Sequence, residues 1–249
     1  MMKKWYKKIL NKMWHDAFMH NDKNIALLAE SVRGRIVLDL GCDDGLRAGN
    51  NLQGIFLAGN RVFGVDITYH ALLKASRRNI LVTQADASSA LPFSSNVFDL
   101  IHSNQVIEHV SSVDVFMNEV FRITKLGGHV IISTENASSW VNVAAAALGY
   151  QIFSLTNMSS KRAGIGNPFA IHKNENSELL SWTHKTIFSL RGIKEFSQAH
   201  GFEIVKMEGA GYFPFPTNLA KMDPWHSHFI TVLLKKKKCK LLVYGRRSK

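Results

Sequence analysis

Short apolar runs alternate with helical patterns along most of the chain. Seven runs are nearly continuous in apolar residues, as strands buried on both faces of a sheet tend to be. Apolar residues at helical spacing lie between several of them, for example at positions 113, 116, 117, 120, 121 and 123. This alternation predicts an α/β fold with a mostly parallel, seven-stranded sheet and helices on both faces. The predicted strands cover residues 35–41, 61–67, 79–86, 97–103, 127–136, the end of 187–209, and 228–236, and the predicted helices cover 45–58, 69–78, 112–124 and the start of 187–209.

One long stretch interrupts the alternation. Residues 137–183 hold a helical piece followed by Gly, Asn, Pro and Ser in irregular order. A long irregular insertion in a compact domain is usually functional, and we expect this one to be a lid over the sheet end. The predicted segments are a basic amphipathic helix at 1–30, a ligand-binding core at 31–136, the lid at 137–183, the rest of the same domain at 184–236 and a basic tail at 237–249.

The net charge of +12 lies at the two ends of the chain. Residues 1–20 contribute +4 and residues 235–249 contribute +8, so the middle is neutral. Proteins that grip nucleic acid usually carry positive charge around the working cleft, so nucleic acid is an unlikely partner. The basic ends indicate peripheral contact with an anionic membrane, or solubilising tails. For the N-terminal helix, with tryptophans opposite lysines, the alternatives are a membrane-interface helix and a helix folded over the binding site.

Two cysteines, Cys42 and Cys239, offer neither a disulfide framework nor a tetrahedral zinc set. They favour a reducing compartment, and no signal peptide or membrane span is evident. The chain is therefore predicted to be cytoplasmic, or peripheral at a membrane, and no metal site is predicted.

Candidate chemistry follows three successive strands. The stretch "VLDLGCDDGLRAG" at 37–49 is a strand, a glycine turn and the start of a helix. Asp66 ends the second strand, where a carboxylate can accept both hydroxyls of a ribose. Asp86 follows the third strand, where an acid can accept a hydrogen bond from an adenine amine. Together these residues predict a site for an adenosine with something attached.

These motifs resemble those of class I S-adenosylmethionine-dependent methyltransferases, in particular the type 11-like branch that acts on small molecules and lipids. The first motif of that family is an acid followed by glycines at alternate positions, and Asp39, Gly41 and Gly45 occupy its first, third and seventh places. "FGVDI", "QADAS", "HSNQVIEHV" and "LGGHVIISTEN" resemble its later motifs. The resemblance implies a Rossmann-like, doubly wound fold and S-adenosylmethionine as cofactor. Asp43 departs from the pattern, since the family has glycine there, although aspartate tolerates a left-handed turn.

The resemblance also implies a set of site residues. His109 and His184 are the predicted catalytic bases, needed only if the methyl acceptor must lose a proton; the alternative for His109 is a structural role. Asn104, Gln105, Glu135, His172 and Tyr212 are expected beside them near the transferred methyl group. The predicted cofactor-binding residues are Asp39, Gly41, Cys42, Asp43, Gly45, Asp66, Ile67, Asp86, Ala87, Asn104 and Gln105.

Three functions stay open at this point. The first is methyl transfer to a small-molecule acceptor or to a lipid- or glycan-linked one. The second, suggested by Asp43, is a protein that binds S-adenosylmethionine without catalysing. The third is an RNA methyltransferase that uses the basic tails, although the loop after the fourth strand lacks the Asn/Asp-Pro-Pro-aromatic tetrapeptide of enzymes that methylate base amines.

Overall fold

The computed structural model describes residues 2–30, 35–46, 59–170, 172–173 and 182–237. Its strands form one seven-stranded sheet in the order β3-β2-β1-β4-β5-β7-β6. The first five strands pair in parallel, and β7 runs antiparallel to both β5 and β6. The predicted mostly parallel, doubly wound α/β fold is therefore confirmed. The strands are β1 Ile36–Leu40, β2 Arg61–Asp66, β3 Leu81–Gln84, β4 Phe98–Asn104, β5 Thr124–Glu135, β6 Phe202–Ala210 and β7 Phe229–Lys236.

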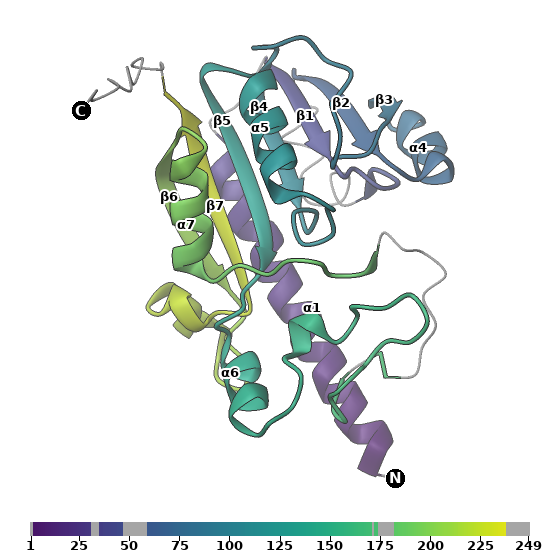
Figure 1. Ribbon diagram of the computed structural model, residues 1–249, viewed down its shortest axis with the longest axis vertical. Helices are drawn as coiled ribbons and strands as arrows, with labels where there is room; N and C mark the ends of the chain where they lie inside the picture. The colour runs from purple at the N-terminus through teal and green to yellow at the C-terminus, as the bar shows by residue number, and fades with distance from the viewer. Residues whose placement is uncertain (1, 31–34, 47–58, 171, 174–181, 238–249) are drawn as a thin grey trace, which may run out of the picture.

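Helices cover both faces of this sheet (Figure 1). On one face α5 and α7 pack over a core of buried side chains from β1, β4, β5 and β7. On the other face α1 and α4 pack over a second core that includes Val37, Leu100 and Ile131. The sheet is thus buried on both sides, which explains why its strands read as apolar runs. The helices are α1 Met2–Ala29, α4 Tyr69–Ser76, α5 Val113–Ile123, α6 Trp140–Ala147 and α7 Leu190–Ala199, with 3-10 turns η1 Phe153–Leu155, η3 Thr217–Lys221 and η4 Pro224–His226.

Local chemistry explains where α5 and α7 begin. Ser112 precedes α5 and its hydroxyl accepts the backbone N–H of Val115 at 3.3 Å. Ser189 precedes α7 and accepts the N–H of Gly192 at 3.1 Å in the same way. Each serine thereby satisfies one of the backbone donors that a helix leaves unpaired at its start. Gly201 follows α7 with a φ of 87°, a conformation that glycine adopts without strain.

Several predicted boundaries differ from the structure. The strand predicted at 127–136 begins earlier, because Thr124 already pairs with Phe98 directly after α5 ends. Most of the helix predicted at 45–58 lies outside the described residues, as do residues 238–249 of the basic tail. Lys236 belongs to β7 and is buried, with its ammonium donating to Asn96 Oδ1 at 3.0 Å and to the Thr124 carbonyl at 2.8 Å. This lysine stabilises the end of the sheet and does not face an anionic surface.

The N-terminal helix α1 is long enough to have two environments. Its second half packs on the sheet through Ile25, Leu28 and Ala29. Its first half extends past the carboxyl ends of the parallel strands, on the same side as α6 and the segment after it (Figure 1). Leu10 and Ala17 are buried there, in agreement with a helix folded over the binding region. Among the described residues, none of the helices combines the length and the apolar character that crossing a bilayer requires.

Candidate active site

A cavity of about 1360 Å³ lies at the carboxyl ends of the parallel strands. Open α/β sheets bind their ligands at this end, near the point where the strand order reverses. Here the reversal lies between β1 and β4. Ligand pockets commonly measure about 300–1,000 Å³, so this cavity has room for a cofactor and a second molecule. Its walls come from the loops after β1 to β4, the first half of α1, α6, the described residues between α6 and α7, and the loop after β6.

The loop after β1 approaches the cavity through glycine and aspartate. Gly41 has a φ of 83°, and a Cβ atom there would lie 2.2 Å from Val106 Cγ2, so no other residue fits without displacement. Asp43 has a φ of 46°, which is the left-handed conformation expected of it. Its backbone N–H donates to Asp66 Oδ2 at 2.9 Å. The loop after β1 and the acid after β2 are therefore held together before any ligand binds.

Two carboxylates border the cavity on the β2 and β3 side. Asp66 Oδ1 accepts the N–H of Thr68 at 2.8 Å, and Asp86 Oδ1 accepts the N–H of Ser88 at 2.7 Å. These backbone bonds fix both side chains while each carboxylate keeps lone pairs for a ligand. Ile67 and Ala87, the residues that follow the two acids, also line the cavity. The arrangement fits the predicted contacts with a ribose and an adenine.

Three predicted cofactor residues lie outside the cavity wall. The register of β1 and β4 places Asp39 opposite His102, and Asp39 Oδ1 lies 2.8 Å from His102 Nδ1 with both side chains buried. Cys42 packs in the core beside α4, and burial raises the pKa of its thiol. At Gly45, a Cβ atom would lie 2.9 Å from Ile80 Cδ1, so this glycine permits close packing of the loop. These three residues pack behind the loop after β1, on the side away from the cavity. Their direct contact with a cofactor stays a prediction.

The residues after β4 reach the middle of the cavity. Gln105 has a φ of 57°, an uncommon conformation for a residue other than glycine, and such conformations cluster at functional sites. Its side chain lies 3.4 Å from the Ser133 hydroxyl. The Asn104 side-chain nitrogen is buried with no hydrogen-bond partner among the described residues, and Asn104 lines the cavity. An unsatisfied donor in this position is suited to a ligand's carboxylate or carbonyl.

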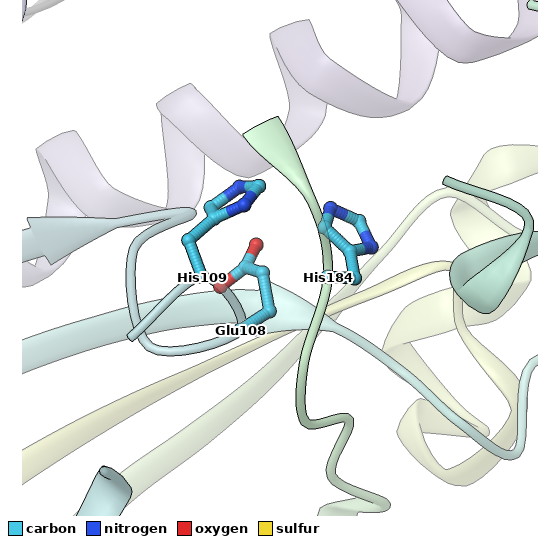
Figure 2. Close-up of side chains that lie close together, drawn as sticks. All are labelled: Glu108, His109 and His184. Carbon is cyan, nitrogen blue, oxygen red and sulfur yellow. The ribbon is translucent and has the colours of Figure 1, made fainter. Parts of the chain in front are cut away.

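Farther along the cavity, Glu108, His109 and His184 form what we call the Glu–His cluster. A carboxylate oxygen of Glu108 and one nitrogen from each imidazole lie within 4.8 Å of one another. The two rings are 4.6 Å apart between centroids and inclined by 66°. Figure 2 shows the Glu108 carboxylate beside the two rings, on the same side of the cluster. Glu108 and His109 come from the loop after β4, whereas His184 follows the lid, so the fold brings together residues far apart in sequence.

Burial controls the protonation of this cluster. Glu108 is fully buried, and that burial raises the pKa of its carboxyl to about 7. Burial, and next the neighbouring His184, lower the pKa of His109 to about 4. His109 is therefore a neutral imidazole at physiological pH, able to accept a proton or bind a cation. Displaced pKa values beside a large cavity are typical of functional sites.

Every residue expected near the transferred methyl group lines this one cavity: Asn104, Gln105, His109, Glu135, His172, His184 and Tyr212. The Tyr212 hydroxyl donates to Asp223, which His226 also contacts at 2.8 Å. His226 stacks on Trp140 at the start of α6, with 4.3 Å between ring centroids. The loop after β6 is thereby connected to the lid side of the cavity.

Sequence reasoning missed Glu108 and the polar face of α1. The signal for Glu108 was its position beside His109 in "IEHV", where a carboxylate adjoins a predicted base. Asn21 is buried on α1 and donates to Asn104 Oδ1 at 3.2 Å, while its own oxygen accepts the hydroxyls of Ser133 and Thr231. An asparagine in a basic helix offers no sequence signal for such contacts.

A family model described as a methyltransferase domain matches residues 13–207. The chain belongs to this family. The match confirms the resemblance to class I S-adenosylmethionine-dependent methyltransferases, and it confirms S-adenosylmethionine as the cofactor that the family implies.

Curated relatives agree with this assignment, and a solved structure shares the fold. The chain is 33% identical over 125 residues to a malonyl-acyl-carrier-protein O-methyltransferase of Erwinia billingiae, covering 50% of this chain and 48% of the relative. It is 29% identical over 136 residues to a ubiquinone biosynthesis O-methyltransferase of Rhodopseudomonas palustris, covering 53% of this chain and 50% of that relative. The chain thus spans about half the length of these relatives. An S-adenosylmethionine-dependent methyltransferase from Mesorhizobium loti shares the fold, with a TM-score of 0.53 and 19% identity over 82% of this chain and 92% of that one.

Proposed function

We propose that this protein transfers a methyl group from S-adenosylmethionine to an oxygen atom of a small molecule, or of a group carried on a lipid, glycan or carrier protein. The observation that carries the proposal is the single cavity that joins Asp66 and Asp86 to the Glu–His cluster. The names of the relatives, which are O-methyltransferases acting in ubiquinone biosynthesis and on a carrier-linked malonyl group, support an oxygen acceptor. The apolar and aromatic residues of the lid side suit an acceptor with an apolar body.

Different residues along the cavity contact different parts of S-adenosylmethionine in this proposal. Asp66 binds the ribose hydroxyls and Asp86 binds the adenine amine, while the Asn104 amide donates to the carboxylate of the methionine part. S-adenosylmethionine supplies a methyl group already activated on a sulfonium, so the protein mainly aligns the reactants and excludes water.

An acceptor hydroxyl must lose its proton as its oxygen forms the new C–O bond and the S–C electron pair passes to sulfur. His109 and His184 lie at this end of the cavity. We propose that they promote the loss of this proton, either directly as bases or through a bound ion.

Calorimetry of the full chain with S-adenosylmethionine and S-adenosylhomocysteine tests the first part of the proposal. We expect one molecule of either to bind per chain, and no binding of either would contradict the proposal. Turnover is then measured on a panel of hydroxyaromatic, quinol and carrier-linked carboxyl acceptors. Binding without turnover on any acceptor would favour the non-catalytic alternative that Asp43 suggested.

The RNA alternative and the membrane contact remain proposals that depend on the basic ends. Removal of residues 238–249 leaves β7 and its buried Lys236 in place. If RNA were the acceptor, this truncation would lower activity and flatten its salt dependence. If the tail instead attaches a cytoplasmic enzyme to anionic lipid, the truncated chain would keep its activity on a soluble acceptor and lose its retention on anionic vesicles.

A further inference from the structure

The Glu–His cluster presents three ligand atoms to one point in the cavity. We propose that Glu108, His109 and His184 bind a divalent transition-metal ion of the zinc type at the acceptor end of the cavity. The ligand atoms lie within 4.8 Å of one another. Three atoms at that limiting separation each lie about 2.8 Å from the point equidistant from them, whereas Zn–N and Zn–O distances are about 2.0–2.2 Å. Side-chain rotations that move each ligand atom inward by about 0.6–0.8 Å would therefore complete the coordination.

Hydrogen bonds to the backbone orient both imidazoles for this role. His109 Nδ1 lies 3.2 Å from the Thr183 carbonyl oxygen, and His184 Nδ1 lies 2.6 Å from the Ser154 carbonyl oxygen. A carbonyl oxygen only accepts, so Nδ1 carries the hydrogen in each neutral ring and the lone pair is on Nε2. Histidine ligands of metals almost always donate their other ring N–H to a carbonyl or carboxylate in this way.

The third ligand is a carboxylate that is satisfied on one side only. Glu108 Oε2 accepts the hydroxyl of Thr134 at 2.9 Å. Glu108 Oε1 is buried and has no hydrogen-bond partner among the described residues. An unsatisfied carboxyl oxygen in the interior is unfavourable, and a cation bound at Oε1 would remove that penalty.

The segments that carry the ligands are fixed to one another. The backbone N–H of Lys185 donates to the Glu108 carbonyl oxygen at 2.7 Å, so the segment with His184 is held against the loop with Glu108 and His109. Glu135 adds a second carboxylate, with its Oε2 3.9 Å from His184 Nδ1. Lys185 also borders the cavity, so its positive charge acts against the favourable effect of these two carboxyl groups. The ligand-bearing segments are thus preorganised, and a bound cation would favour the ionised form of Glu108.

The donor set indicates the kind of ion. Two imidazole nitrogens and one carboxylate oxygen suit Zn²⁺ or a neighbouring first-row ion, whereas Mg²⁺ and Ca²⁺ prefer oxygen ligands alone. Three protein ligands leave at least one coordination position open, as in catalytic metal sites. All three residues line the cavity, so the open position is available to an acceptor.

One consequence for methyl transfer rests on the proposed function. An acceptor hydroxyl bound to the ion would release its proton to solvent more readily. Its oxygen would then attack the methyl carbon as the S–C electron pair returns to sulfur.

Metal binding is tested directly on the full chain after dialysis against EDTA. We expect calorimetry with Zn²⁺ to show one site per chain, and Co²⁺ to give the visible absorption of a low-symmetry site. Changing even a residue that only orients a ligand lowers metal affinity by about 10–100-fold, so Glu108→Gln and His184→Gln should each lower it by at least that much. Thr134→Val should weaken binding by about 10–100-fold because it removes the hydrogen bond to Oε2. His70→Gln, at an exposed histidine of α4, is the matched control and should bind Zn²⁺ as the unaltered chain does.

S-adenosylhomocysteine binding by each variant shows that it is folded and separates this inference from the proposed function. If no Zn²⁺ binds, or if Glu108→Gln and His184→Gln bind it as tightly as His70→Gln does, the metal site is contradicted while the methyltransferase proposal stands. If Zn²⁺ binds at the cluster but neither S-adenosyl compound binds, the metal site stands and the proposed function is wrong.

Discussion

The two ends of the cavity are built in different ways. At the cofactor end, the loops after β1, β2 and β3 each supply a short motif, and backbone N–H groups hold Asp66 and Asp86 in place. At the acceptor end, the Glu–His cluster unites the loop after β4 with a segment more than 70 positions later in the chain, as the bond between His109 and Thr183 illustrates. The first end depends on local backbone geometry, and the second depends on long-range packing. Substitutions at the two ends should therefore have separable effects on cofactor binding and on turnover.

The largest effect is expected at Gly41, where the backbone of the cofactor end is most constrained. Gly41→Ala would place Cβ 2.2 Å from Val106 Cγ2 at a φ of 83°. Backbone strain and overpacking each cost about 1–3 kcal/mol, so we expect calorimetry to show S-adenosylhomocysteine affinity reduced by roughly 100-fold. Gly127→Ala is the matched control, since Gly127 has a φ of 80° with nothing within 4 Å of its Cβ position. Equal losses in the two variants would refute a specific role for the β1 loop.

A smaller loss of cofactor affinity is expected on substitution of Asp66, the carboxylate that the loop after β1 contacts. Asp66→Asn keeps the shape of the side chain but replaces an acceptor oxygen with a donor. Hydrogen bonds to charged groups contribute about 1.5–3 kcal/mol, so cofactor affinity should fall by about 10–100-fold. Asp99→Asn serves for comparison, because Asp99 accepts the Ile36 N–H at 3.0 Å and pairs with Lys125 away from the cavity. An unchanged affinity in Asp66→Asn would remove Asp66 from the site.

The attachment of α1 to the sheet beside the cavity can be tested at Asn21. Asn21→Ala would leave the buried hydroxyls of Ser133 and Thr231, and the amide of Asn104, without their partner on α1. Unsatisfied buried groups cost about 1–3 kcal/mol each, partly offset by relaxation, so the free energy of unfolding should fall by about 2 kcal/mol in urea denaturation. Asn11→Ala, at an exposed position of α1, should leave it unchanged. A stable Asn21→Ala variant would show that the hydrogen bonds of Asn21 do not anchor α1.

The smallest effect on activity is expected at Tyr212, which lines the acceptor end of the cavity. Tyr212→Phe removes the hydroxyl that donates to Asp223 and so loosens the loop after β6. One hydrogen bond contributes about 1 kcal/mol, which corresponds to about a fivefold fall in kcat/KM for the acceptor. Cofactor affinity should stay the same, since Tyr212 lies on the lid side. Should cofactor affinity fall in parallel, the two ends would not be separable.

The sequence predicted the sheet, and several of the residues it proposed for the cofactor line the cavity. Apolar runs located the strands because both faces of the sheet are buried. The aspartates at the ends of β2 and β3 indicated where a ligand binds, because parallel strands have their carboxyl ends at the same edge of the sheet. Asp43 has a left-handed conformation, which the sequence analysis noted that aspartate tolerates. These features depend on neighbours in sequence, and for that reason a sequence pattern can reveal them.

The acceptor end could be predicted only as a collection of candidate residues. His109 and His184 were named, but nothing in their spacing indicated that their rings lie 4.6 Å apart beside Glu108. Asp39 was assigned to the cofactor from its motif, whereas the register of β1 and β4 directs its carboxylate to His102. Contacts of this kind arise from tertiary packing, and a single sequence carries no record of which distant side chains meet.

The division of α1 into two environments has a consequence for how new acceptor preferences could arise. Residues such as Leu10 and Trp14 contact the cavity, while Ile25 and Leu28 anchor the same helix in the core. Exchanges in the first half can reshape the wall while the second half keeps the helix docked. The helix is thus a separable module on which acceptor selectivity can diversify, by natural drift or by directed recombination, while the cofactor end keeps its loops and its chemistry.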